Sequence, residues 1–340
     1  MRRYGKRKAS KNNPKGYSVK LYDKTPGIKR PTCANAVNLV YYLRNAVEGE
    51  QNSIAAAVLL DGRRPELFPL SGGIRMNLEQ FLCNADEKPL DRIPANGGFC
   101  SIFRTIGCIG DSLSSGEFES EDESGQKGYH DYYEYSWGQY IARMCGSTVY
   151  NFSRGGMTAK EYWETFAQAN DFWSPDKLCQ AYIIALGVND FNHKELAVGS
   201  VQDIDLQDYS RNANTFVGYY GRIIQRLKQM QPRARFFLVT MPQSGEPARD
   251  EIALRHGALM HQLAEIFDHT YVIDLREYGP VYDAEFQRAF YLGGHLNPAG
   301  YALTGQMIAA YIDYLVRSHP VDFAQVGFIG TSLTNFRYPE

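Results

Sequence analysis

Residues 102–113 read IFRTIGCIGDSL, an apolar run that ends in Gly-Asp-Ser-Leu at positions 110–113. The run has the length and the β-branched content of a buried strand. A serine that leaves such a strand and enters a helix holds its hydroxyl near the helix amino end, which favours developing negative charge. We therefore expect a strand over residues 102–109, followed by a loop in which Ser112 is placed for chemistry.

The same alternation of strand and helix continues to the end of the chain. Four further strands are predicted from apolar runs with β-branched or aromatic residues, at residues 148–152, 181–186, 236–239 and 271–273. Apolar residues at helical spacing lie between them, as in 216–227 and 252–266, and the last helix is expected to begin at Asn297-Pro298. Such alternation predicts a parallel sheet covered by helices on both faces.

Three other strand exits and loops carry polar or glycine residues. Gly156 follows the 148–152 strand, and its backbone amide can approach a ligand without obstruction by a Cβ atom. Asn189 lies in Gly-Val-Asn-Asp after the 181–186 strand, and His295 lies just before the last helix. Because ligands bind where the carboxyl ends of parallel strands converge, we expect these residues and Ser112 to share one site.

These four blocks, in this order, resemble the GDSL, or SGNH, hydrolase family over about residues 101–316. The resemblance implies a flavodoxin-like three-layer α/β/α sandwich and ester or thioester hydrolysis. It further implies that Ser112 is the nucleophile and that His295 is the general base. The oxyanion donors would be the backbone amides of Ser112 and Gly156 and the side-chain amide of Asn189. No metal and no organic cofactor is implied.

One position departs from the family pattern. The family usually has an aspartate three residues before the histidine, and here that residue is Leu292. Three explanations stay open: a backbone carbonyl near residues 292–293 orients His295, which we favour; another acid replaces the aspartate; or the enzyme is weak or inactive. The nearby acids are Asp283, Glu285 and Asp274, of which Asp283 is the preferred candidate. Asp111 and Asp190 are expected to brace the loops.

An acidic segment, residues 117–123, separates the nucleophile from the next helix. Aromatic residues follow it: Tyr129, Tyr132, Tyr133, Tyr135 and Trp137. A solvated acidic loop, with Trp137 and Tyr140 packed between helix and sheet, is the favoured interpretation. The alternative is a lid over Ser112, in which exposed aromatic rings stack on a sugar.

Composition sets the class of protein. With 340 residues, 44% apolar and 13% aromatic, the chain is long and apolar enough for a sizeable core. No run approaches the roughly 18 apolar residues of a membrane span, and the polar, basic start does not resemble a secretory signal. We therefore expect a cytoplasmic protein that binds neither membrane nor nucleic acid. The six cysteines include no Cys-x-x-Cys pair, which favours buried thiols over a zinc site or disulfides.

Charge and composition divide the chain into three predicted parts. Residues 1–30 hold 11 Lys or Arg and one acid, a net charge of +10, whereas the rest holds 25 basic and 37 acidic residues, a net charge of −12. The predicted parts are a basic, solvated tail (1–30), an accessory α/β region (31–97) and an SGNH hydrolase domain with a C-terminal extension (98–340). The accessory region rests on a helical pattern at 34–47 and an apolar run at 54–60.

The function expected from this sequence is a serine esterase that removes short acyl groups, such as acetyl, from a carbohydrate or another small-molecule ester. Short acyl groups are the common theme of the resembled family. Two alternatives remain: an acyltransferase that uses the same serine, and a non-catalytic binding module.

Overall fold

The computed structural model describes residues 55–57, 67–69, 82–193 and 196–337. The chain divides into two compact units, Met1–Arg75 and Met76–Glu340. In the first unit the described part is an antiparallel pair, β1 (Ala55–Ala57) and β2 (Leu67–Pro69), and β1 lies within the predicted strand at 54–60. The predicted basic tail and the predicted helix at 34–47 lie outside the described residues.

Within the described residues, the second unit is built on a five-stranded parallel sheet. Its strands are β3 (Thr105–Gly110), β6 (Thr148–Ser153), β7 (Ala181–Ala185), β8 (Arg235–Val239) and β9 (Thr270–Ile273). The strands lie in the order β6-β3-β7-β8-β9, which is the flavodoxin-like order 2-1-3-4-5. All five strands confirm the prediction. The first begins at Thr105 instead of residue 102 because Gly98–Ile102 forms a 3₁₀ helix.

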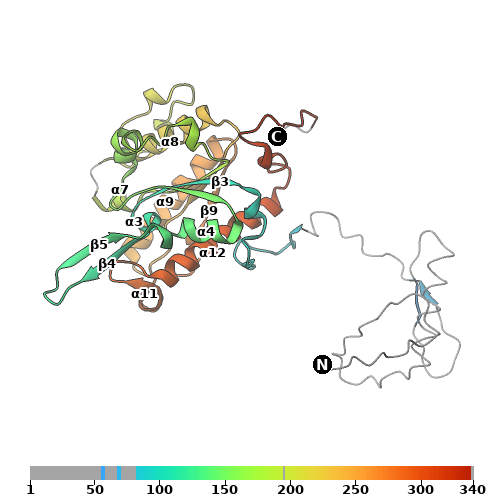
Figure 1. Ribbon diagram of the computed structural model, residues 1–340, viewed down its shortest axis with the longest axis horizontal. Helices are drawn as coiled ribbons and strands as arrows, with labels where there is room; N and C mark the ends of the chain where they lie inside the picture. Colours follow the sequence, from blue (N-terminus) through green and yellow to red (C-terminus); the bar gives the residue numbers. More distant parts are fainter. Residues whose placement is uncertain (1–54, 58–66, 70–81, 194–195, 338–340) are drawn as a thin grey trace, which may run out of the picture. The chain divides into compact units, whose positions relative to one another are not determined.

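Helices cover both faces of this sheet, so the predicted three-layer α/β/α sandwich is confirmed (Figure 1). The described helices longer than eight residues are α4 (Trp137–Cys145), α8 (Phe216–Met230), α9 (Pro247–Ile266) and α12 (Pro298–Ser318). Alternate strand residues face opposite layers: Ile183 packs with α4 and α12, whereas Tyr182 and Ile184 pack with α8 and α9. As expected, α12 begins at Asn297-Pro298, and the Asn297 side chain accepts a hydrogen bond from Gly300 N.

Shorter elements connect these layers. The short helices are α3 (Ser112–Ser115), α5 (Ala159–Glu161), α6 (Ala167–Ala169), α7 (Val188–His193), α10 (Leu275–Tyr278) and α11 (Ala284–Phe290), with a π-helical turn at Tyr162–Phe166 between α5 and α6. Two antiparallel hairpins complete the described part: β4 (Glu117–Glu121) with β5 (Lys127–Asp131), and β10 (Tyr291–Leu292) with β11 (His295–Leu296). The β4–β5 hairpin projects from the body of the unit (Figure 1). None of the helices in the described part is long and apolar enough to cross a bilayer.

A buried ion pair attaches the segment before residue 98 to α12. Arg317 Nη2 lies 2.6 Å from Glu87 Oε1, Nη1 donates to the carbonyl of Leu82, and Nε lies 2.8 Å from Asp313 Oδ2. The Arg317 side chain is only 3% exposed. Residues 82–97, which the sequence prediction placed in the accessory region, therefore contact the sandwich, and the predicted domain boundaries stay a prediction.

The C-terminal extension packs on the body only in its first part. Phe323, Val326 and Ile329 are buried in the core beside α12. Leu333 and Phe336, near the end of the extension, are exposed. The five described cysteines are free thiols, three of them buried, and Cys33 lies outside the described residues.

A buried histidine links the ends of two central strands. His256, on α9, is 1% exposed. Its Nε2 lies 3.0 Å from the carbonyl oxygen of Leu186, and its Nδ1 accepts from Met241 N. An imidazole that donates from one nitrogen and accepts at the other is neutral. Burial accordingly lowers the pKa of His256 to about 4.

This burial predicts a pH-dependent stability. Between about pH 6.5, the usual histidine pKa, and about pH 4, the unfolded chain binds a proton that the folded chain does not, so stability falls as the pH falls. The neutral His256 side chain should contribute about 3 kcal/mol to the free energy of unfolding above this pH range, and this stabilisation is lost below it. Urea unfolding at about pH 7 and about pH 4.5 should show a shallower fall for His256→Gln than for the wild type.

His261→Gln is the control for this experiment. Its half-exposed imidazole pairs with Asp274, which raises the pKa of His261 and so adds stability at low pH. Loss of the His261 imidazole should therefore make the fall in the free energy of unfolding from about pH 7 to about pH 4.5 steeper, not shallower. Equal slopes for the wild type and His256→Gln would show that His256 does not titrate on unfolding.

Candidate active site

The carboxyl ends of three neighbouring strands bring three of the predicted site residues to one edge of the sheet. β3 lies between β6 and β7, and Ser112, Gly156 and Asn189 follow these three strands. The boundary between β3 and β7 is also where the strand order reverses, which is the usual ligand position in this architecture. The structure thus places these residues as the sequence predicted.

Ser112 is the first residue of α3 and is half-buried. Asp111 caps this helix, because its side chain accepts from Leu113 N at 3.0 Å. The Asp111 side chain is 2% exposed, and burial raises its pKa to about 7. Asp111 therefore braces the loop that carries Ser112, as expected.

The second and third loops are bonded to each other. Asn189 Nδ2 donates to the carbonyl oxygen of Met157 at 3.1 Å, and the Asp190 carboxylate accepts from Ala159 N at the start of α5. A side-chain amide carries two hydrogens, so Asn189 keeps one for a ligand. Gly156 has a φ of +73°, in the left-handed region that favours glycine.

His295 reaches this edge from the far end of the chain. It lies on β11, which contacts α3, and its side chain is 15% exposed. Tyr301, on the helix α12 that follows His295, links this helix to the segment of Ser112 and Glu117. Its hydroxyl donates to the carbonyl oxygen of Glu117 at 2.7 Å and lies 3.2 Å from the carbonyl oxygen of Ser112. The structure therefore brings the predicted base and nucleophile into one neighbourhood.

Two glutamates that the sequence analysis did not single out contact the imidazole. His295 Nε2 lies 3.1 Å from Glu117 Oε1, and Nδ1 lies 3.6 Å from Glu119 Oε2. Among the described residues the ring nitrogens thus face these carboxylates and not Ser112, and Nδ1 has no hydrogen-bond partner. The ring of Tyr129 lies edge-on to His295 at 5.8 Å between centroids.

The two carboxylates have different surroundings. Glu119 is 6% exposed, and hydrogen bonds from Lys127 and from Gly294 N lower its pKa. For Glu117, burial raises the pKa of the carboxyl, and the nearby His295 acts in the opposite direction and lowers it. Glu119 is consequently the better-held anion of the two.

The predicted orienting acids lie elsewhere, which corrects that expectation. Asp283 caps α11 by accepting from Glu285 N and Phe286 N, and Glu285 itself is exposed. Asp274 pairs with His261 at 2.8 Å. A backbone carbonyl does not hold Nδ1 either, since this nitrogen has no hydrogen-bond partner among the described residues.

The favoured interpretation of residues 117–123 as a solvated loop is wrong for its first half. Residues 117–121 form β4, and the exposed part is its end and the following turn, residues 120–126. The signal that was available is the Glu-Phe-Glu alternation, since strand residues two apart share one face. Trp137 packs between helix and sheet as expected, whereas Tyr129, Tyr132, Tyr133 and Tyr135 are exposed.

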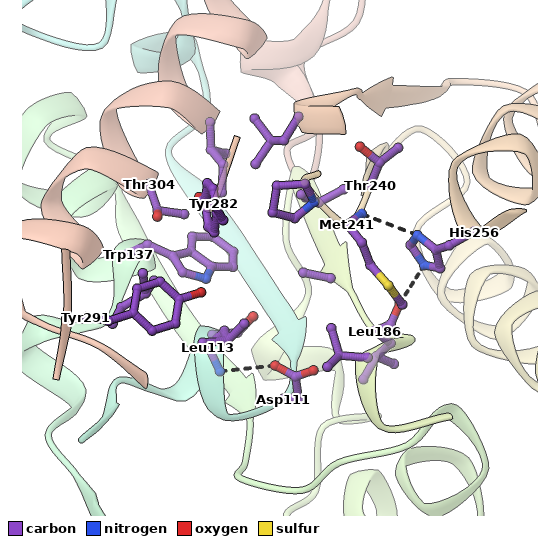
Figure 2. Close-up of a pocket in the computed structure, with 18 residues that line it drawn as sticks. Asp111, Leu113, Trp137, Leu186, Thr240, Met241, His256, Tyr282, Tyr291 and Thr304 are labelled. Atoms are coloured by element: carbon purple, nitrogen blue, oxygen red, sulfur yellow. Dashed lines mark hydrogen bonds between the residues drawn. The ribbon is translucent and has the colours of Figure 1, made fainter. Parts of the chain in front are cut away.

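An apolar cleft lies beside the loop that carries Ser112. Its inner part, about 620 Å³ with its open mouth, is lined by residues from all layers, including Leu113, Trp137 and Tyr282 (Figure 2). The outer part, about 1220 Å³, shares Leu113 with it and reaches Gly293 and Gly294, the two residues before His295. The cleft therefore borders the site on the side of α9 and α11.

No group of histidine, cysteine and acidic residues in the described part of the chain is arranged to hold a metal ion. The contacts at the site are those of backbone amides, one carboxamide, one imidazole, one hydroxyl and two carboxylates. These groups are the ones that acyl transfer through a serine requires.

Comparison with solved structures returns several esterases. Est24, a carbohydrate acetylesterase from Sinorhizobium meliloti, has 16% identity and a TM-score of 0.44, with 62% of this chain and 99% of that chain covered. A carbohydrate esterase family 2 enzyme with a carbohydrate-binding domain from Corynascus thermopiles (Myceliophthora fergusii) has 17% identity and a TM-score of 0.44, with 63% and 66% covered. A protein from Lactobacillus plantarum has 16% identity and a TM-score of 0.45, with 64% and 98% covered.

No curated protein matches this chain. Residues 108–303 match the model of the GDSL-like Lipase/Acylhydrolase family, which confirms the resemblance drawn from the four sequence blocks. The matched stretch includes Ser112, Gly156, Asn189 and His295 and spans more than half of the chain. The chain therefore belongs to the GDSL-like lipase/acylhydrolase family and is an ester hydrolase.

Proposed function

We propose that this ester hydrolase acts through an acyl-serine intermediate, with Ser112 as the nucleophile and His295 as the general base. The observation that supports this most is the contact between α3, which begins at Ser112, and β11, which carries His295. Segments that are far apart in the chain meet here at the switch point of the sheet. Function in such folds resides in the convergence of such groups.

The reaction is a double displacement. Ser112 Oγ attacks the ester carbonyl carbon while its proton passes to His295 Nε2; the tetrahedral intermediate then expels the alcohol, which takes that proton. Water repeats the sequence on the acyl-serine and releases the carboxylic acid and free Ser112. Because Nε2 contacts Glu117 in the structure, the imidazole must exchange Glu117 for Ser112 before the first proton transfer.

Three donors are proposed for the oxyanion: the backbone amides of Ser112 and Gly156 and the side-chain amide of Asn189. The bond between Asn189 and Met157 supports this, because it fixes the amide beside the Gly156 loop and leaves one hydrogen free. The amide of Ser112 lies at the amino end of α3, where backbone donors are unsatisfied. Loss of one such donor costs about 3–4 kcal/mol in the barrier.

The proposed substrate is a short-acyl ester of a carbohydrate or another small molecule. A Cβ atom on Gly155 would lie 2.0 Å from Glu117 Oε2, so the Glu117 carboxylate fills the space beside the oxyanion loop and leaves little room for a long acyl chain there. The exposed Tyr129 ring beside His295 offers an apolar face for a sugar. Transfer of the acyl group to a second alcohol is the alternative with the same chemistry.

The nucleophile is tested by Ser112→Ala. We expect kcat/KM for p-nitrophenyl acetate to fall by about 10⁴-fold or more, since alanine has no hydroxyl that could form the acyl intermediate. A fluorophosphonate probe should label Ser112 in the wild type. Well-folded wild-type protein that neither hydrolyses the ester nor takes the label would indicate a non-catalytic binding module.

Acyl length is tested with a series of p-nitrophenyl esters. Acetate should exceed octanoate in kcat/KM by about tenfold or more, because the acyl group of the octanoate clashes with Glu117. A preference for octanoate that Ala185→Leu removes would show instead that the acyl chain enters the apolar cleft, which Ala185 lines. A sugar that raises product acylation above hydrolysis would favour the acyltransferase.

A further inference from the structure

We propose that Glu119 is the positioning residue of His295: its carboxylate accepts a hydrogen bond from Nδ1–H, fixes the tautomer and presents Nε2 to Ser112. Glu119 would thus do from the β4–β5 hairpin what an acid at position 292 does elsewhere in the family. The inference rests on the proposed function, in which His295 is the general base.

The strand geometry directs Glu119 at the imidazole. Glu117 and Glu119 are two residues apart on β4, so their side chains leave the same face of the strand. β4 contacts β11, and the Glu119 Oε2 atom lies 3.6 Å from His295 Nδ1. This nitrogen is buried and has no hydrogen-bond partner among the described residues, so it needs an acceptor. Catalytic hydrogen bonds are often long in free enzymes and shorten when substrate binds.

The two glycines before His295 leave room for this carboxylate. A Cβ atom on Gly293 would lie 2.7 Å from the Glu119 carboxyl carbon, and one on Gly294 would lie 2.8 Å from its Oε2. Gly293 also has a φ of +69°, which favours glycine. The glycine pair therefore allows the close approach of Glu119 to the β10–β11 turn.

Glu119 is also held firmly enough to position another group. Lys127, across the hairpin, lies 2.6 Å from Oε1, and Gly294 N donates to Oε2 at 2.9 Å. These two donors lower the pKa of Glu119 and keep it ionised at neutral pH. An anchored, ionised acceptor beside Nδ1 is the arrangement that orients a catalytic histidine.

Glu117 does not meet this requirement, because it contacts Nε2, the nitrogen that must accept the Ser112 proton. Leu292 does not meet it because its side chain carries no hydrogen-bond acceptor. Leu292 nevertheless lies directly opposite His295 in the β10–β11 register, and its side chain is half-exposed. An acid introduced there would approach the imidazole from the strand that the family pattern uses.

The test is Glu119→Gln in the full-length protein, with p-nitrophenyl acetate as substrate. We expect kcat to fall by about 10²–10⁴-fold with little change in KM, because an amide can donate to the imidazole and select the wrong tautomer. Glu119→Asp should retain more activity than Glu119→Gln. The matched control is Glu121→Gln, the same change two residues further along the same strand at an exposed position, which should leave kcat unchanged.

Two further readouts separate positioning from a structural role. In the Glu119→Gln background, Leu292→Asp should restore kcat by about tenfold or more, since it returns an acid to the imidazole. Nitrogen-15 NMR of His295 should show a proton on Nδ1 in the wild type and its loss from Nδ1 in Glu119→Gln. This spectrum does not depend on turnover.

The outcomes distinguish this inference from the proposed function. If Ser112→Ala abolishes hydrolysis but Glu119→Gln keeps wild-type kcat and an Nδ1 proton, Glu119 is not the positioning residue and the serine mechanism stands. If the wild type neither turns over substrate nor labels at Ser112, the proposed function fails and this inference fails with it. Equal losses in Glu119→Gln and Glu121→Gln would show that the hairpin is only structural.

Discussion

Parallel pairing of β3 between β6 and β7 is the constraint on which the rest of the structure depends. Parallel strands end at the same edge, so every loop that follows them must begin there. This pairing brings Ser112, Gly156 and Asn189 close together, and hydrogen bonds between neighbouring loops, such as Asn189 to Met157, hold them there. The helix α3 then adds its amino end to the same place, where a negative charge is stabilised.

The imidazole reaches this edge by a different route. His295 lies on a two-residue strand before α12, outside the main sheet, and its side chain contacts the β4–β5 hairpin. A largely buried imidazole with carboxylates at both nitrogens is costly unless the charges are compensated. Lys127 and the Gly294 amide supply that compensation for Glu119, which explains how a hairpin that projects from the body can contribute an ordered acid to the site.

Strand and helix predictions succeeded where hydrophobic periodicity was strong, as for β7 and α8, whose apolar residues are buried in the observed layers. The strand at residues 102–109 began later than predicted because local backbone geometry at Gly98–Ile102 outweighs the apolar composition. The acidic segment was misread because its charge suggested solvation, whereas the alternation of Glu117 and Glu119 places two carboxylates on one face. Among the nearby acids, Asp283 was the preferred candidate to orient His295, yet its carboxylate caps α11 instead.

The amino-acid sequence by itself determined the parallel α/β sandwich and the family, and it predicted Ser112, Gly156, Asn189 and His295 as one group. It did so because periodicity and the residues at strand exits are local properties of the chain. Only the tertiary structure decided which carboxylates face the imidazole. That choice depends on the packing of β4 against β11, a contact between segments about 175 residues apart that no local pattern encodes.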